Sequence, residues 1–193
     1  MVMIPFFLFF MVVPEVLGVS ASRIVCAVLF LLTALTDMLD GKIARKYNLI
    51  TDFGKFMDPL ADKLMVFGAM FGILVLTSAD SGLDRELFSG VTASSLFMRV
   101  FAFCAFVIVF RELAVTSMRM VVSNADGIVI AANIFGKIKT VSQIIGITVM
   151  IIEPLFSDLL IASYVFLAVM VVTTLFSGFS YFKAYWPHIN SNK

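Results

Sequence analysis

The sequence predicts an all-α, polytopic membrane protein with six transmembrane helices, and three observations indicate this class. Of the 193 residues, 61% are apolar, and the mean hydropathy is +1.06. Soluble domains have an apolar content nearer one half. Apolar runs recur along the chain at about the 20 residues that a helix needs to cross a bilayer. No linker or low-complexity stretch separates them, so residues 1–193 are expected to form one integral-membrane domain.

The apolar runs divide the chain into six segments. The first is short and ends at Pro14-Glu15, which indicates either a thinly spanning helix or a chain that begins late relative to its natural start. Cys26 and Cys104 lie far apart in apolar segments, so buried free thiols are expected rather than a disulfide. The expected helices cover residues 2–18, 23–41, 55–77, 93–118, 138–156 and 159–182.

Charge placement predicts the orientation of these helices. The basic stretch 42–48, interpreted as a loop, belongs in the cytoplasm by the positive-inside rule, and alternation places both termini there too. The acidic stretches 80–86 and 153–158 then fall on the opposite side. The basic residues that fall on the cytoplasmic side include Arg111, Arg119, Lys137, Lys139 and Lys183. The net charge of only +1 argues against a polyanion-binding role, so no nucleic-acid partner is expected.

Two further groups of residues predict helix surroundings. Tyr181, Tyr185 and Trp186, near the end of the last segment, fit an aromatic belt at the membrane interface. Small residues allow helix backbones to approach closely. The glycines expected at close helix crossings are Gly68, Gly72, Gly146 and Gly178.

Four aspartates with a strict spacing are the most informative feature of the chain. The pattern is Asp37-x-x-Asp40-Gly41-x-x-Ala44-Arg45, eight residues, then Gly54-x-x-x-Asp58-x-x-x-Asp62. A carboxylate beside hydrocarbon costs several kcal/mol unless it is paired, hydrated or bound to a cation. On helices, the i, i+3 and i, i+4 spacings place each pair of aspartates on one face. Two facing helices would therefore bring four carboxylates together.

Clustered carboxylates are the ligands that Mg²⁺ or Mn²⁺ prefers, and four of them can hold two ions for phosphoryl transfer. Zinc is excluded because the two cysteines are remote and the only histidine is His188, near the tail. The structural alternative is that small residues pack helices and that the aspartates pair with basic neighbours. Such pairing does not require the observed spacing. The basic neighbours are Lys42, Arg45, Lys55 and Lys63.

At every position, the aspartate pattern resembles the signature of the CDP-alcohol phosphotransferase family. The resemblance implies a six-helix membrane enzyme, typically a homodimer, that transfers a phosphate-linked group from a CDP-alcohol to a hydroxyl and releases CMP. It implies that Asp37, Asp40, Asp58 and Asp62 bind divalent metal, with Asp62 as the general base. It also implies that the CDP moiety is bordered by Asp37, Asp40, Gly41, Ala44, Arg45, Gly54 and Asp58.

Within the family, the chain is similar over nearly its whole length to bacterial members that use CDP-diacylglycerol and sn-glycerol 3-phosphate. The similarity is carried by residues 54–63, by Arg111-Glu112 with Arg119, and by residues 136–140. The charges independently favour an anionic acceptor. Arg111 and Arg119 lie about two helical turns apart near one face, and two lysines begin the next helix. The expected acceptor-phosphate residues are Arg111, Arg119, Lys137 and Lys139.

Other interpretations remain open from the sequence. The lysines could serve only as positive-inside anchors, and Glu112 could be the structural partner of Arg111. Family members with serine, inositol, inositol phosphate or phosphatidylglycerol as acceptor are the nearest alternatives. A cation transporter would require carboxylates near mid-membrane and an inverted repeat, and no internal repeat is evident. A purely structural membrane subunit would leave the aspartate spacing unexplained.

The resemblance also sets expectations for location and for the start of the chain. A bacterial cytoplasmic (inner) membrane location is expected, with the active site facing the cytoplasm and the acyl chains remaining in lipid. Family members usually have an Asn-Pro-Asn-like stretch, a Thr and an Arg before the first Ile-Pro. This chain opens at Met1-Val2-Met3-Ile4-Pro5, so we expect that it lacks this leader, through truncation or a late start.

Overall fold

The computed structural model describes residues 3–47, 52–81, 93–126, 134–157 and 159–190, and within these ranges the regular structure is entirely helical. Two 3₁₀ turns, η1 (Pro14–Val16) and η2 (Glu153–Leu155), lie between helices. The α-helices are α1 (Met3–Val12), α2 (Val19–Lys46), α3 (Asp52–Ser81), α5 (Ala93–Asp126), α6 (Ile134–Ile152) and α7 (Ile161–Asn190).

Each predicted segment corresponds to one of these helices, but the prediction of six membrane spans is not confirmed. Within the described residues, four helices contain a stretch long and apolar enough to cross a membrane: α2, α5, α6 and α7. The chain is therefore a multi-pass membrane protein by the length and composition of its helices. The α1 helix has 10 residues and a length of about 15 Å, half the thickness of a bilayer core. In α3 the apolar part is limited to Lys63–Ser78.

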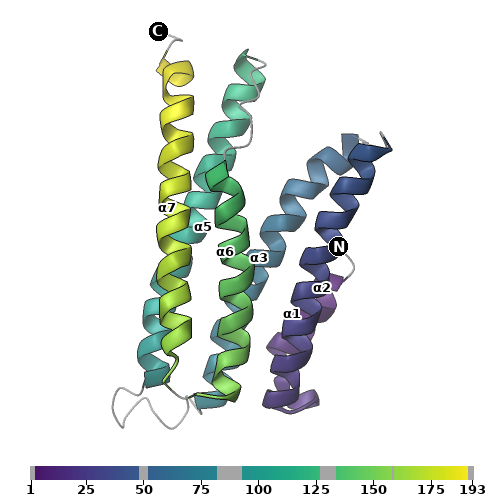
Figure 1. Cartoon of the computed structure of the whole chain (residues 1–193), viewed down its shortest axis with the longest axis vertical. Helices are drawn as coiled ribbons and strands as arrows, with labels where there is room; N and C mark the ends of the chain where they lie inside the picture. Colours follow the sequence, from purple (N-terminus) through teal and green to yellow (C-terminus); the bar gives the residue numbers. More distant parts are fainter. Residues whose placement is uncertain (1–2, 48–51, 82–92, 127–133, 158, 191–193) are drawn as a thin grey trace.

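The helices run side by side along the long axis of the molecule (Figure 1). The last three pack against one another through α5–α7 and α6–α7 contacts, while α1 packs on α2 and α3. Contacts of α2 with α6 and of α3 with α5 join these two groups. Because α2 and α3 run in opposite directions, the end of α2 and the start of α3 lie at the same end of the bundle, which we call the motif end (Figure 1).

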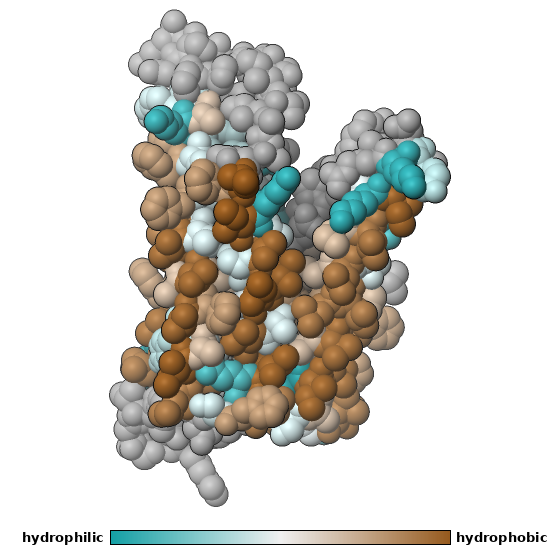
Figure 2. Space-filling view, viewed as in Figure 1, coloured by the Kyte–Doolittle hydropathy of each residue, from teal (hydrophilic) through white to brown (hydrophobic). Residues whose placement is uncertain are grey.

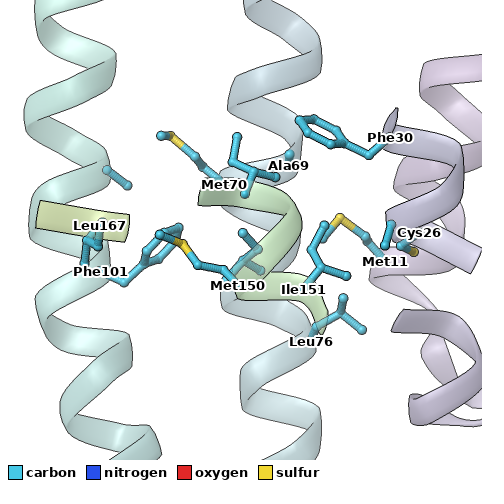
Figure 3. Close-up of a cluster of buried hydrophobic side chains, with 14 of the residues drawn as sticks. Met11, Cys26, Phe30, Ala69, Met70, Leu76, Phe101, Met150, Ile151 and Leu167 are labelled. Carbon is cyan, nitrogen blue, oxygen red and sulfur yellow. The ribbon is translucent and has the colours of Figure 1, made fainter. Parts of the chain in front are cut away.

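A core of buried apolar side chains joins the six described α-helices, and Figure 3 shows part of it. Met11, Phe30, Phe101 and Met150 are fully or almost fully buried in it. The face of the molecule that is shown in Figure 2 is also apolar over most of its height, as expected for contact with lipid. Both cysteines are free thiols, as predicted; Cys26 is buried and Cys104 is half-buried.

The glycines that were predicted to mark close crossings do lie against neighbouring helices. A Cβ atom on Gly68 would lie 2.7 Å from Leu8 Cδ2, and one on Gly72 would lie 2.3 Å from Met11 Sδ. These two glycines therefore allow the short α1 helix to pack closely on α3. A Cβ on Gly146 of α6 would similarly meet Met170 of α7.

The turn between α6 and α7 is closed by Glu153. Its carboxylate accepts hydrogen bonds from the backbone N–H groups of Ala162 and Ser163, in the first turn of α7. An acidic group at this position satisfies unpaired donors and interacts favourably with the helix dipole. The turn therefore fixes the start of α7, the helix that carries several contacts at the motif end.

Arg23 joins three helices at the end of the bundle opposite the motif. Its side chain is buried, and its Nη1 and Nη2 atoms donate to the carbonyl oxygens of Ile151 in α6 and Leu76 in α3, at 3.2 and 3.4 Å. Neither carbonyl can be approached by water in so buried a setting. The sequence analysis did not single out this residue, although an arginine inside an apolar segment indicates that a polar partner is needed.

We expect Arg23→Ala to lower the free energy of unfolding by about 2–4 kcal/mol, because it removes charge-assisted hydrogen bonds and leaves a cavity. The measurement is thermal unfolding in detergent. Arg99→Ala is the matched control. Arg99 is an exposed arginine near the start of α5, at the same end of the bundle as Arg23, and its loss should change the free energy of unfolding by less than about 0.5 kcal/mol. Equal stability of the two variants would contradict a joining role for Arg23.

Candidate active site

The first half of the aspartate motif lies on α2. Asp37 and Asp40 are exposed, and their i, i+3 spacing on a continuous helix places them on one face. The interpretation of the basic stretch from residue 42 as a loop is wrong in part, because α2 continues to Lys46. Tyr47 caps the end of this helix, and its backbone N–H donates a hydrogen bond to the carbonyl oxygen of Ile43. Alanine, arginine and lysine are strong helix formers, so the charged stretch extends the helix beyond the apolar part.

The second half of the motif lies on α3. The backbone of Gly54, Asp58 and Asp62 is helical, within a helix that begins at Asp52. The side chains of Asp58 and Asp62, and those of Ala44 and Arg45 on α2, lie outside the described part of the chain. The structure therefore brings both halves of the motif to one end of the bundle, whereas the convergence of the four carboxylates remains a prediction.

The surface at the motif end is hollowed between α2 and the group formed by α5, α6 and α7 (Figure 2). Hydrophilic residues border this hollow, in contrast to the apolar surface farther along the helices (Figure 2).

Arg111 is held inside the bundle by α5 and α7. Its Nη1 atom donates to Glu112 Oε1 at 2.9 Å, and its Nη2 atom donates to Ser177 Oγ at 2.8 Å. Its Nε atom is buried and has no hydrogen-bond partner among the described residues. The predicted alternative, that Glu112 is a partner of Arg111, is confirmed by this contact.

The other three predicted acceptor residues have different surroundings. Lys139 of α6 is half-buried, and its Nζ atom lies 2.6 Å from Glu112 Oε1. Lys137 is exposed. The guanidinium carbon of Arg119, also exposed, lies 5.3 Å from the centre of the Tyr181 ring, an arrangement typical of a cation–π interaction. Arg111 and Lys139 thus meet at one carboxylate, whereas Lys137 and Arg119 do not contact it.

Tyr181 and Tyr185 do not form the predicted interfacial belt. Both are buried inside the chain, where they pack with Val115 and Met118 of α5. Trp186 is exposed, so of the three aromatic residues only this one has the position that a belt requires. The tyrosines lie inside because α5 extends to Asp126 and covers the upper part of α7.

Three residues of the site were not assigned to it by the sequence analysis: Glu112 as a shared carboxylate, Ser177 and Gly178. A Cβ atom on Gly178 would lie 2.9 Å from Arg111 Nε, so the absence of a side chain makes room for the arginine. The available signal was the pair of adjacent charges 111–112 within an apolar segment, which requires partners from other helices.

Comparison with known proteins places this chain in a family. Residues 1–176 match the family model described as CDP-alcohol phosphatidyltransferase, and the chain belongs to this family. The resemblance carried by the aspartate motif is therefore confirmed, and the fold is that of a helical, membrane-embedded member of it.

The similar proteins come from several bacteria. The chain is 34% identical, over 98% of its length and 92% of the relative, to a CDP-diacylglycerol--glycerol-3-phosphate 3-phosphatidyltransferase of Bacillus subtilis. A protein of the same name from Rickettsia bellii is 30% identical over 84% of this chain and 80% of its own. Another from Yersinia pestis is 30% identical over 97% and 91%.

Proposed function

We propose that the chain transfers a phosphatidyl group from CDP-diacylglycerol to sn-glycerol 3-phosphate, giving phosphatidylglycerophosphate and CMP. The observation that carries the proposal is the location of both motif halves at the end of the bundle where Arg111, Glu112 and Lys139 meet. The names of the relatives support the same donor and acceptor, since the similarity covers almost all of the chain.

The chemistry assigned to the chain is an in-line displacement at phosphorus. Asp62 accepts the proton of an acceptor hydroxyl, and that oxygen attacks the phosphorus that bears diacylglycerol. The bond from this phosphorus to the bridging oxygen of the diphosphate breaks, and CMP leaves with that oxygen. General-base catalysis of this kind contributes about 10²–10⁴-fold, and correct positioning contributes much of the remainder.

The residues fit a divalent cation by the chemistry of their donors. Asp37 and Asp40 offer exposed carboxylates on one helix face, beside the helix that carries Asp58 and Asp62. These four residues would hold two ions, Mg²⁺ or Mn²⁺. When bound, such ions supply neutralisation of the charge on the diphosphate. The same aspartates, with Gly41, Ala44, Arg45 and Gly54, would border the cytidine diphosphate.

The acceptor would be selected by charge. Arg111 and Lys139 lie together at Glu112, with Lys137 and Arg119 on the same helices, and a phosphate monoester is a suitable ligand for such a group. We also propose that the motif end faces the cytoplasm of a bacterial cell, in the inner membrane, and that the working form is a homodimer. The positive-inside rule supports this orientation.

The test is an acceptor panel with purified protein and labelled CDP-diacylglycerol. We expect product and CMP with sn-glycerol 3-phosphate, and less than about one hundredth of that rate with serine, inositol or phosphatidylglycerol, since none of these three acceptors carries a phosphate monoester for the buried arginine to bind. Turnover with any of these three acceptors at an equal rate would overturn the acceptor assignment. Ion flux in proteoliposomes without any turnover would favour the transporter class.

A further inference from the structure

Tyr181 of α7 lies close to both α5 and the first turn of α6 at the motif end. The guanidinium carbon of Arg119, on α5, is 5.3 Å from the centre of the tyrosine ring. On the other helix, a Cβ atom on Gly136 would lie 3.2 Å from the tyrosine hydroxyl oxygen. Gly136 directly precedes Lys137. One side chain of α7 therefore joins the part of α5 that carries Arg119 to the part of α6 that carries Lys137.

The ring of Tyr181 is held in place by its other neighbours. Only 7% of the residue is exposed, and its side chain packs with Val115 and Met118 of α5. The ring also stacks on that of Tyr185, with centroids 6.3 Å apart and an interplanar angle of 19°. Val115 precedes Arg119 by four residues, so both lie on one face of α5. The tyrosine therefore gives the exposed arginine a fixed surface to rest on.

A cation–π contact holds an arginine without neutralising it. The ring has no net charge, so the guanidinium group keeps its full positive charge for a ligand. A carboxylate partner would instead compensate that charge and occupy N–H donors that an anion needs. An arginine side chain also loses conformational freedom when it binds a ligand, and a contact that already restricts the side chain lowers this cost. The contact with Tyr181 therefore suits an arginine that has to bind an anion.

We propose that Tyr181 is a positioning residue for the acceptor: its ring orients Arg119 toward the phosphate monoester of the incoming substrate, and the absence of a side chain at Gly136 leaves room for that ring. This inference rests on the proposed function and adds a residue on α7 to its acceptor site. Tyr181 itself does not contact the reacting atoms.

The experiment measures KM for both substrates in Tyr181→Leu, which removes the ring but keeps an apolar side chain. We expect the KM for sn-glycerol 3-phosphate to rise about 3- to 10-fold, the range that a cation–π interaction contributes. The KM for CDP-diacylglycerol should change less than about twofold, as should the acceptor KM in Tyr181→Phe, which keeps the ring face. The matched control is Tyr164→Leu, the same change near the start of α7, where the ring packs on Phe97.

A double variant separates positioning from general packing. Arg119→Ala should raise the acceptor KM by at least as much as Tyr181→Leu does. Adding Tyr181→Leu to Arg119→Ala should then change this KM by less than about a further twofold, because the arginine that the ring orients is already gone. A tyrosine that only stabilised the bundle would have the same effect with or without the arginine.

Gly136 keeps the test decisive if Tyr181→Leu does not fold. Gly136→Ala places a methyl group 3.2 Å from the tyrosine hydroxyl oxygen but 3.8 Å from the nearest ring carbon. Alanine is a better helix former than glycine, so this variant should fold. We expect the displaced ring to raise the acceptor KM about 3- to 5-fold. Adding Tyr181→Phe removes the hydroxyl and leaves an ordinary contact, so the acceptor KM should return to within about twofold of wild type.

Two failures can be told apart. If the wild-type chain does not turn over sn-glycerol 3-phosphate, the proposed function is wrong. If the wild type does so and the acceptor KM is unchanged in Tyr181→Leu, or in Gly136→Ala where that protein does not fold, the positioning role alone is overturned. An acceptor KM raised equally in Tyr164→Leu, an equal effect of Tyr181→Leu without Arg119, or no rescue of Gly136→Ala by Tyr181→Phe would also overturn it.

Discussion

Asp62→Asn is expected to abolish CMP release, with a fall in kcat of about 10³-fold or more while the protein remains in the membrane. An amide cannot accept the proton of the acceptor hydroxyl, and loss of a general base costs about 10²–10⁴-fold. The side chain would also lose a charge that a divalent ion requires, so the two losses act in the same direction. The measurement is CMP formation by purified protein at saturating concentrations of both substrates.

The control for this substitution lies on the same helix. Asp80 is near the other end of α3, so Asp80→Asn makes the same chemical change far from the motif. We expect its activity to stay within about twofold of wild type, as for most substitutions away from a site. Retention of more than about one tenth of wild-type turnover in Asp62→Asn would show that another group takes the proton.

The helices could be predicted from the sequence because each apolar run is long enough to be distinctive. The ends of the helices could not be predicted in the same way. The second segment was expected to end at residue 41, where charged residues begin, whereas α2 continues to Lys46. Hydrophobicity marks the part of a helix that meets lipid, whereas backbone hydrogen bonding continues through helix formers beyond it. The α5 helix also extends further than expected, to Asp126 rather than ending at 118.

The number of membrane spans was harder to predict than the number of helices. The first segment was expected to cover 2–18, but Pro14 and Gly18 interrupt it, and α1 ends at Val12. Gly18 has a φ of +82°, a conformation that few other residues adopt. A short apolar helix and a membrane-spanning helix have the same composition, so only the length of the helix and the helices that pack against it distinguish them.

The candidate site was predictable where its residues are close in sequence. The spacing of Asp37 and Asp40 placed both on one helix face, and the structure confirms that helix. By contrast, the partners of Arg111 include Ser177, 66 residues away, and Lys139 reaches Glu112 across 27 residues. Such contacts depend on which helices pack together, and a single sequence does not reveal this packing. The two buried tyrosines were misjudged for the same reason.

Removal of divalent cations is expected to have the second large effect, a loss of about 10³-fold or more in turnover that excess Mg²⁺ restores. In the proposed site the four aspartates and the diphosphate are all negative, so without a cation they would repel one another. Two unit charges about 4 Å apart interact by about 4 kcal/mol at an effective dielectric constant of 20, which corresponds to about a thousandfold in rate. The measurement is CMP release after dialysis against chelator, followed by titration with Mg²⁺ or Mn²⁺.

Two substitutions connect this loss to particular side chains. Asp40→Asn should raise the Mg²⁺ concentration for half-maximal activity by about tenfold or more, because the site loses one charged oxygen ligand and metal affinity depends on charge. Glu153→Gln changes a carboxylate that binds the start of α7 at the opposite end, so its metal dependence should equal that of wild type. Turnover that persists in excess chelator would contradict the metal assignment, because carboxylates at this spacing would then repel the diphosphate with nothing to offset the repulsion.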